Sequence, residues 1–266
     1  MIYVVPSLKA KEKLQCEGKA WAESQGFTYV PRGKRTIQDL MDEYGEDFLV
    51  YSSRGPQIDR PEGSHFFSLN MAELRIQNLR KGQRDHLLEA LMGRGSSKLP
   101  ITVLDCTCGF GADAAVASFG LPTGSRVDAL EVSPLLEAVT SWGFSHFVHK
   151  KDDVTAALRR ISLRRGDYRD YLLSDEGPVY DVLYFDPMFQ RPVEASCQFQ
   201  PVRAIMEHGG LTRDLIERAL QKAWRRVVIK ERDFRQLCRD FPEVTLYGGK
   251  YSRIGYAVLE CDSWKK

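Results

Sequence analysis

The amino-acid sequence predicts an α/β fold, with a Rossmann-like arrangement in its larger part. Strand-like segments alternate with helical segments throughout the 266 residues, a pattern typical of helices packed on a sheet. Hydrophobic residues make up 43% of the chain and charged residues 28%, which are ordinary globular values. These values exclude a disordered, collagen-like or coiled-coil chain. A chain of this length buries roughly 70–75% of its unfolded surface, so it needs no disulfide or metal to fold.

The N-terminal part predicts a small α/β region of its own. We expect strands at residues 2–5, 28–30 and 48–51, and helices at 9–24 and 36–44. Residues 53–68 carry Gly55, Pro56, Pro61 and Gly63, so we expect a connecting loop there. Helices follow near 70–79 and 83–91, and residues 93–100 form a second break. We place the boundary near residue 80, with a small region at 1–80 and a larger domain at 81–266.

The alternation is clearer from residue 101 onward. We expect strands at 101–104, 126–130, 162–164, 179–185, 226–230 and 256–261, and helices at 113–118, 154–160 and 211–224. Another helix is predicted to begin with Ser133 as its N-cap and Pro134 at its first position. The last strand follows a turn at Gly248–Gly249, which suggests an antiparallel hairpin at the edge of the sheet.

A glycine-rich segment, residues 103–114, joins the first strand of this part to a helix. Gly109 and Gly111 allow close backbone approach that a Cβ would block. The pattern Gly109-x-Gly111-x-x-Ala114 also fits a dinucleotide-binding fingerprint, although a lone match is weak. The alternative is a structural turn with incidental glycines.

Acidic residues end three of the predicted strands, where open α/β sheets bind ligands. Asp105 precedes the glycines, where a carboxylate can receive an ammonium group but would repel a pyrophosphate. Glu131 lies 20 residues after Gly111 and can accept both hydroxyls of a ribose. With Asp186 as the third acid, the set suits S-adenosylmethionine, which has an ammonium, a ribose and no phosphate. Asp167, after Gly166, is a candidate for the adenine edge or an ordinary turn acid.

The segment 184–191 follows the most apolar predicted strand. Its Asp186-Pro187-Met188-Phe189 motif resembles the Asn/Asp-Pro-Pro-Tyr/Phe loop of methyltransferases that modify a nitrogen conjugated to a ring or carbonyl, with Met188 in place of the second proline. The Asp186 carboxylate and the Pro187 carbonyl can hold the two hydrogens of a planar amine and orient it for methyl transfer. Phe189 offers a face on which a flipped base can stack. The alternative is a turn with Phe189 in the core.

These motifs together resemble the RsmJ-type class I methyltransferases. The resemblance covers roughly residues 65–260 and includes the 66–76 run, while the first ~60 residues resemble a Gram-positive relative. It implies a seven-stranded, mostly parallel sheet with an antiparallel last strand. It also implies methylation of guanine N2 in small-subunit ribosomal RNA and cofactor contacts at 112–113, 131–132, 166–167 and 186. The complete predicted cofactor site is Asp105, Thr107, Gly109, Gly111, Ala112, Asp113, Glu131, Val132, Gly166, Asp167 and Asp186.

The net charge of +2 argues against a polycation that coats nucleic acid by bulk charge. Basic residues nevertheless cluster at 75–84, 159–169 and 222–235, where they either contact phosphates or form solvated helix faces. As RNA-contacting residues we single out Arg191, Arg75 and Lys81. We predict no metal site, since Cys106 and Cys108 have no second Cys/His pair nearby.

The prediction is an S-adenosylmethionine-dependent N-methyltransferase acting on ribosomal RNA or the small ribosomal subunit. Alternatives are a methyltransferase for another amine, such as protein glutamine or adenine, a non-catalytic RNA-binding or assembly factor, and a nicotinamide oxidoreductase. No signal peptide, membrane span or lipidation motif is evident, so we expect a cytoplasmic protein without a membrane partner. The sequence does not specify an oligomeric state.

Overall fold

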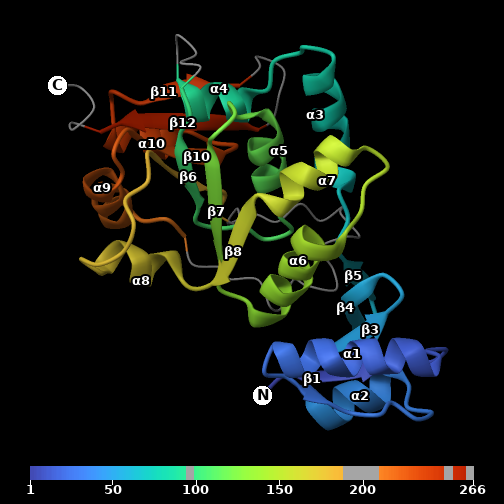
Figure 1. Ribbon diagram of the computed structural model, residues 1–266. Coiled ribbons are helices and arrows are strands. Elements are labelled where there is room, and N and C mark those ends of the chain that lie inside the picture. The colour runs from blue at the N-terminus through green and yellow to red at the C-terminus, as the bar shows by residue number, and fades with distance from the viewer. Residues whose placement is uncertain (94–98, 188–209, 249–253, 262–266) are drawn as a thin grey trace. The chain divides into compact units, whose positions relative to one another are not determined.

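The computed structural model describes residues 1–93, 99–187, 210–248 and 254–261 (Figure 1). They form two compact units. The first consists of Met1–Ser68 and Ser133–Phe147, and the second contains the described residues of Leu69–Val132, 148–187, 210–248 and 254–261. In this described part of the chain, no helix is both long and apolar enough to span a membrane.

The first unit is built on a five-stranded sheet with the strand order β2-β1-β3-β4-β5. Its strands are β1 (Tyr3–Pro6), β2 (Thr28–Tyr29), β3 (Phe48–Ser52), β4 (Gly55–Arg60) and β5 (Gly63–Phe66), and its helices are α1 (Glu12–Ser24), α2 (Ile37–Tyr44) and α6 (Pro134–His146). β1 pairs in parallel with β2 and β3, whereas β4 is antiparallel to β3 and β5. The predicted strands and helices of residues 1–51 are therefore present.

The expected loop at residues 53–68 was wrong, because this segment forms the hairpin of β4 and β5. Gly55 adopts a φ of +88°, which allows the chain to turn directly from β3 into β4. Pro56 is tolerated because it lies near the start of β4 and pairs only with Tyr51 of β3, while β5 begins its pairing at Gln57. Turn-forming residues thus mark the ends of these strands and not one long loop.

Helix starts in this unit follow the local sequence signals. Thr36 caps α2 in a capping box with Asp39, in which each side chain bonds the other residue's backbone N–H. The prediction for Ser133 and Pro134 is confirmed: Ser133 Oγ accepts the backbone N–H of Leu136, and Pro134 is the first residue of α6.

The second unit is built on a seven-stranded sheet with the order β11-β12-β10-β9-β6-β7-β8. Its strands are β6 (Thr102–Asp105), β7 (Arg126–Glu131), β8 (Ile161–Arg165), β9 (Val182–Phe185), β10 (Arg226–Glu231), β11 (Thr245–Tyr247) and β12 (Gly255–Glu260). Its helices are α3 (Asn70–Arg80), α4 (His86–Met92), α5 (Ala112–Gly120), α7 (Asp152–Arg159), α8 (Tyr168–Leu173), α9 (Arg213–Lys222) and α10 (Arg235–Asp240). The sequence did not predict α8, α10 or β11.

The strand directions confirm the predicted class I methyltransferase topology. β10, β9, β6, β7 and β8 pair in parallel in that order, and β12 runs antiparallel to both β10 and β11. After β6 the chain forms β7 and β8 on one side of β6, and it later forms β9 on the other side of β6. The strand order therefore reverses between β6 and β9, which is where open α/β sheets form a ligand crevice at the carboxyl ends.

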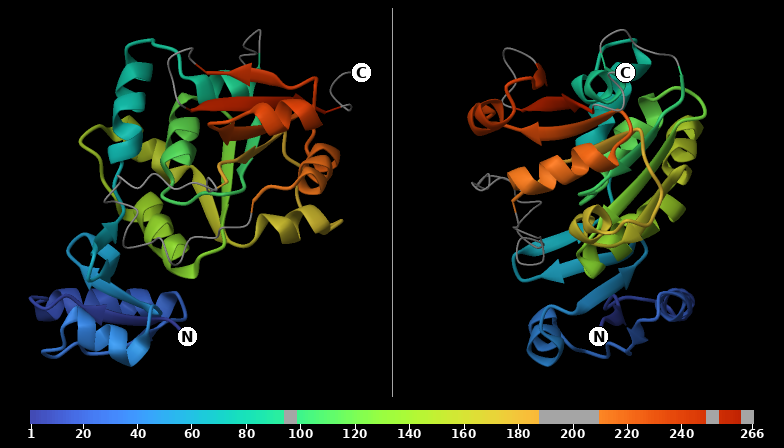
Figure 2. Two further views of the ribbon diagram at one scale, coloured as in Figure 1. Left: turned by 180° about the vertical axis from the view of Figure 1, so that it is seen from behind. Right: turned by 90° about the vertical axis from the view of Figure 1, so that its left-hand side faces the viewer.

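Helices cover both faces of this sheet (Figure 2). On one face, alternate strand residues such as Leu104, Leu183 and Val227 pack in one hydrophobic core with Tyr168 of α8 and Ile216 of α9. The intervening residues face the opposite way, toward α4 and α5, because side chains alternate along a strand. Asp105, Tyr184 and Lys230 occupy these intervening positions.

The boundary between the two compact units does not fall at a single point of the chain, because each unit contains more than one segment. Helix α3 belongs to the second unit, and α6 belongs to the first although it follows β7 in the chain. The division into a small region at 1–80 and a larger domain at 81–266 stays a prediction.

Candidate active site

The loop between β6 and α5 is held in place by backbone hydrogen bonds to its neighbours. Cys106 N–H donates to the carbonyl of Tyr184 on β9 at 2.8 Å, and Cys108 N–H donates to Leu130 of β7 at 2.9 Å. Gly109 and Gly111 have φ angles of +53° and +75°, which favour glycine. Gly111 directly precedes the first residue of α5, so the loop ends at the N-terminus of this helix.

Glu131 is hydrogen-bonded to this glycine loop. Its Oε2 accepts the backbone N–H of Gly109 at 2.8 Å, and its backbone carbonyl accepts the N–H of Gly166 at 3.0 Å. Asp105, Glu131 and Asp186 end or follow the parallel strands β6, β7 and β9, so they lie at the same edge of the sheet.

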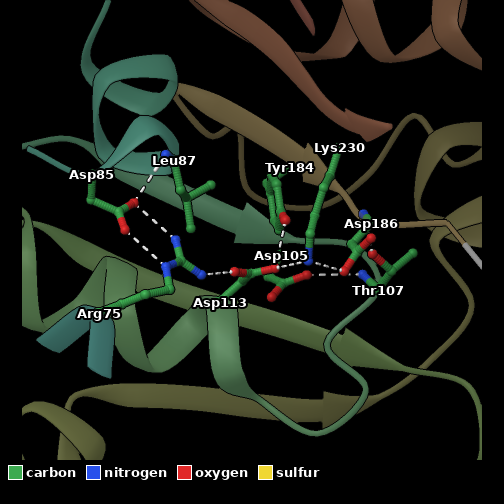
Figure 3. A network of polar contacts seen from close by, with 9 residues as sticks. All are labelled: Arg75, Asp85, Leu87, Asp105, Thr107, Asp113, Tyr184, Asp186 and Lys230. Atoms are coloured by element: carbon green, nitrogen blue, oxygen red, sulfur yellow. Dashed lines mark hydrogen bonds and ion pairs between the residues drawn. The ribbon is translucent and has the colours of Figure 1, made fainter. Parts of the chain in front are cut away.

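A chain of ion pairs links α3, α4, α5, β9 and β10 (Figure 3). Arg75 binds Asp85 with two hydrogen bonds of 2.8 Å and also contacts Oδ1 of Asp113. Lys230 Nζ donates to Asp113 Oδ2 at 2.8 Å and to Asp186 Oδ2 at 2.6 Å. Three carboxylates therefore alternate with two cations, which gives the chain a net charge of −1 when all are ionised.

Tyr184 and Thr107 complete this arrangement. Tyr184 donates its hydroxyl to Asp113 Oδ2 at 2.8 Å, and Thr107 Oγ1 accepts the backbone N–H of Asp186 at 2.7 Å. The Thr107 backbone N–H in turn donates to Asp105 Oδ1 at 3.1 Å. The Asp-Pro segment is thus bonded directly to the glycine loop.

Burial controls the ionisation of the acids in this site. Burial raises the pKa of Asp105 well above its usual value, and the nearby carboxylates Asp113 and Asp186 add to this effect. Burial also raises the pKa of Asp186 to about 6, although the Lys230 ammonium opposes the shift. For Asp113 burial is outweighed by the charges of Lys230 and Arg75, so its pKa lies below its usual value.

The remaining predicted cofactor residues lie around the same edge, with differing surroundings. Ala112 is the first residue of α5, and Val132 follows Glu131 with a partly exposed side chain. Asp167 caps α8: one oxygen accepts the Arg169 backbone N–H at 2.7 Å and the other pairs with the Arg169 guanidinium at 3.0 Å. Asp113, predicted to contact the cofactor, has both oxygens bound by protein groups.

The predicted substrate contacts have a mixed outcome. Phe189 and Arg191 lie outside the described residues. Lys81 is exposed at the end of α3. Arg75 points into the ion-pair chain, so the structure gives it two carboxylate partners where the sequence suggested a phosphate.

Sequence reasoning missed Lys230, Asp85 and Tyr184 as members of the site. Lys230 was grouped with a basic surface cluster, but its side chain is only 14% exposed, and Arg226 in the same group is also buried. One signal could have identified Lys230: a lysine near the carboxyl end of an apolar strand beside the strand that precedes Asp186. Among the described residues, no group of three or more His, Cys, Asp or Glu could hold a metal ion.

The residues gathered at this edge of the sheet fit S-adenosylmethionine. The buried carboxylate of Asp105 and the negative ion-pair chain favour a ligand that carries a sulfonium and an ammonium group. The backbone of the glycine loop lies beside the Glu131 carboxylate, which can accept hydrogen bonds from the hydroxyls of a ribose. A pyrophosphate would meet Asp105 and Asp186 at the same edge, which disfavours a dinucleotide.

Comparison with known proteins agrees with this chemistry. Residues 64–254 match the family model described as putative SAM-dependent methyltransferase. The uncharacterized protein YpiP of Bacillus subtilis is 28% identical over 86% of this chain and 88% of its own. Proteins named ribosomal RNA small subunit methyltransferase J are also 28% identical: that of Dechloromonas aromatica over 72% of this chain and 76% of its own, and that of Pseudomonas fluorescens over 78% and 80%.

A solved structure shows the same fold. The SAM-dependent methyltransferase NGO1261 from Neisseria gonorrhoeae superposes with a TM-score of 0.62 and 18% identity, and the match covers 98% of this chain and 96% of that one. The RsmJ-type resemblance predicted from the motifs is therefore confirmed at the level of family and fold. This chain belongs to the family of putative SAM-dependent methyltransferases, whose cofactor is S-adenosylmethionine.

Proposed function

We propose that this methyltransferase modifies the exocyclic N2 of a guanine in small-subunit ribosomal RNA. The observation that carries the proposal is the placement of Asp186: it directly follows β9, precedes Pro187 and is bonded through its backbone to the glycine loop. An acid–proline pair at this position suits a planar amine substrate. The relatives named ribosomal RNA small subunit methyltransferase J support ribosomal RNA as the substrate class.

The chemistry follows from the nature of the amine. The lone pair of N2 is delocalised into the guanine ring, so the nitrogen is a weak nucleophile. The Asp186 carboxylate and the Pro187 carbonyl each accept one amine hydrogen, which orients the nitrogen and favours a localised lone pair in the transition state. S-adenosylmethionine supplies an electrophilic methyl group. As the N–C bond forms and the S–C bond breaks, the nitrogen becomes acidic and loses one proton to Asp186 or water.

The other residues divide between cofactor and substrate. Asp105 is proposed to bind the cofactor ammonium and Glu131 the ribose, while Val132 is proposed to contact the cofactor and Asp167 the adenine edge. Phe189 is proposed to stack on the flipped guanine and Arg191 to contact a phosphate. Lys81 is exposed and can reach RNA, whereas Arg75 is better suited to hold Asp113. Such an RNA target would be encountered in the cytoplasm.

The test is to identify the nucleoside that loses a methyl group when the gene is deleted. Small-subunit RNA from deletion and parent strains is digested to nucleosides and compared by mass spectrometry. The proposal expects N2-methylguanosine to fall by one residue per RNA in the deletion strain and to return with the wild-type gene. Loss of a different methylated nucleoside would reassign the target, and unchanged RNA would favour a protein glutamine substrate or a non-catalytic factor.

A further inference from the structure

Lys230 is a buried cation to which the proposed chemistry assigns no role. It is the next-to-last residue of β10, and its side chain is 14% exposed. A buried ammonium is costly unless it is paired, and Lys230 is paired with two carboxylates, Asp113 and Asp186. Neither contact is local in sequence, so the folded sheet alone brings them together.

The two carboxylates depend on Lys230 to different degrees. Asp113 has two other partners, Arg75 at Oδ1 and Tyr184 at Oδ2. Within the described part of the chain, Lys230 is the only group that hydrogen-bonds the Asp186 side chain, and it does so at Oδ2. A purely structural pairing with Asp113 would not need this second carboxylate.

Asp186 is consequently anchored from two directions. Its backbone N–H is held by Thr107 of the cofactor loop, and its Oδ2 is held by Lys230 of β10. No hydrogen bond to Oδ1 is formed by the residues described. Two fixed points leave the carboxylate little freedom to rotate, so Oδ1 is the oxygen that remains for a substrate.

We propose that Lys230 is a positioning residue for methyl transfer, which holds Oδ2 of Asp186 so that Oδ1 and the Pro187 carbonyl receive the substrate amine. This inference rests on the proposed function, because it takes Asp186 as the acceptor of an amine hydrogen. Lys230 itself touches neither the amine nor the methyl group. It acts through the orientation and the charge of Asp186.

The charge matters because only an ionised carboxylate is acceptor-only. Burial raises the pKa of Asp186 to about 6, and the Lys230 ammonium limits this rise. The titratable groups that face this carboxylate are Asp105 on β6, Asp113 on α5, Tyr184 on β9, and Lys230 and Glu231 on β10. Because Lys230 is the only cation among them, its removal would leave Asp186 protonated at neutral pH and able to donate to the amine.

The first measurement is the titration of Asp186 in the cofactor-free protein by ¹³C carboxyl NMR, assigned by the signal that Asp186→Asn removes. We expect a midpoint near pH 6 in the wild type and a rise of about 1–3 pH units in Lys230→Met. Lys230→Arg keeps a cation and should restore a midpoint near that of the wild type. The matched control is Lys222→Met, because Lys222 donates to backbone carbonyls of Tyr171 and Glu176 outside the site.

The second measurement is single-turnover methyl transfer over the same pH range. Lys230→Met should lower the rate about 10–100-fold at neutral pH, with a smaller loss at high pH, while the Kd for S-adenosylmethionine changes little. Lys230→Arg should recover part of the rate. An unshifted Asp186 midpoint, or a shifted midpoint with an unchanged rate, would overturn the inference.

Asp113→Asn provides a second variant in case Lys230→Met does not fold. It removes one of the two carboxylates that pair with Lys230. Because the Asp113 charge raises the pKa of Asp186, the Asp186 midpoint should fall below that of the wild type. An unchanged midpoint in this variant would also overturn the inference. Failure of the proposed function gives a different result, namely no methyl transfer to RNA by the wild type, whatever the Asp186 titration shows.

Discussion

Thr107 Oγ1 accepts the backbone N–H of Asp186 at 2.7 Å. This hydrogen bond joins the glycine loop after β6 to the Asp-Pro segment after β9, at the point where the strand order of the sheet reverses. The residues assigned to the methyl donor and those assigned to the methyl acceptor are therefore linked by one side chain. The backbone hydrogen bond from Cys106 N–H to the Tyr184 carbonyl joins the glycine loop to the end of β9 as well.

Replacement of Thr107 tests this link. Thr107→Val keeps the shape but removes the acceptor, which leaves the Asp186 N–H unsatisfied and frees the segment to shift. A shift of this kind should lower kcat about 10–100-fold, with a smaller effect on the KM for S-adenosylmethionine. Thr107→Ser retains the hydroxyl and serves as the matched control. Equal kcat values for the two variants would show that the hydrogen bond does not position Asp186.

The pH dependence of methyl transfer should report on Asp186. Since the ionised carboxylate is the proposed acceptor and its pKa is about 6, kcat should fall as the pH drops through 6. Well below that pH the decrease should approach tenfold per pH unit. In Asp186→Asn the amide oxygen accepts without titrating, so the rate that remains should lose this acidic limb. If kcat still falls near pH 6 in Asp186→Asn, the titrating group is not Asp186.

If Asp105 binds the cofactor ammonium as proposed, cofactor binding should be coupled to the release of a proton. Burial raises the pKa of its carboxyl well above the usual value, and the ammonium of S-adenosylmethionine favours the ionised form. Binding should therefore release a proton, and the affinity should increase as the pH rises toward the raised pKa. Calorimetry in two buffers of different ionisation enthalpy measures the protons released.

Two variants control this experiment. Asp105→Asn should bind S-adenosylmethionine more weakly and release fewer protons. Asp128→Asn removes another buried acid, one that is bound by Arg126 and Tyr180 away from the site, so it should leave proton release as in the wild type. Equal proton release by wild type and Asp105→Asn would contradict the assignment of Asp105.

Arg75 should contribute to stability more than to RNA affinity. Arg75→Met leaves Asp85 and Asp113 without their guanidinium partner, which should lower the free energy of unfolding by about 2–3 kcal/mol, since the side chain is about a quarter exposed. Urea unfolding measures this change. The control Arg84→Met removes a largely exposed arginine that lies 3.6 Å from Glu89, and it should have little effect. An Arg75→Met protein of normal stability but weak RNA binding would restore the phosphate role.

The parts of the site that sequence could predict are those with local signals. Asp105, Glu131 and Asp186 each end or directly follow an apolar strand, and glycines mark the turn after the first of them. Parallel strands bring such positions to one edge, so local patterns were sufficient to predict a shared site. The cap at Ser133 is likewise local, because the side chain and the amide it binds are three residues apart.

The ion-pair chain had no local signal. Lys230 and Asp113 are 117 positions apart, and Arg75 and Asp113 are 38 apart, so only the folded sheet brings them together. In the sequence, an arginine or lysine near other basic residues has the same appearance whether it faces solvent or a buried acid. The β4–β5 hairpin was missed for a related reason. Gly55 and Gly63 are the first residues of its two strands, but glycine is equally common in loops, so the residue type alone does not distinguish the two.

The central claim is that Asp186 presents a guanine amine of small-subunit RNA to S-adenosylmethionine. The most direct test incubates the purified protein with methyl-labelled S-adenosylmethionine and small-subunit RNA from a deletion strain. We predict label in N2-methylguanosine with the wild type and a rate lowered at least about 100-fold with Asp186→Ala, both measured at saturating S-adenosylmethionine. No label in the RNA, or equal labelling by Asp186→Ala, would contradict the account.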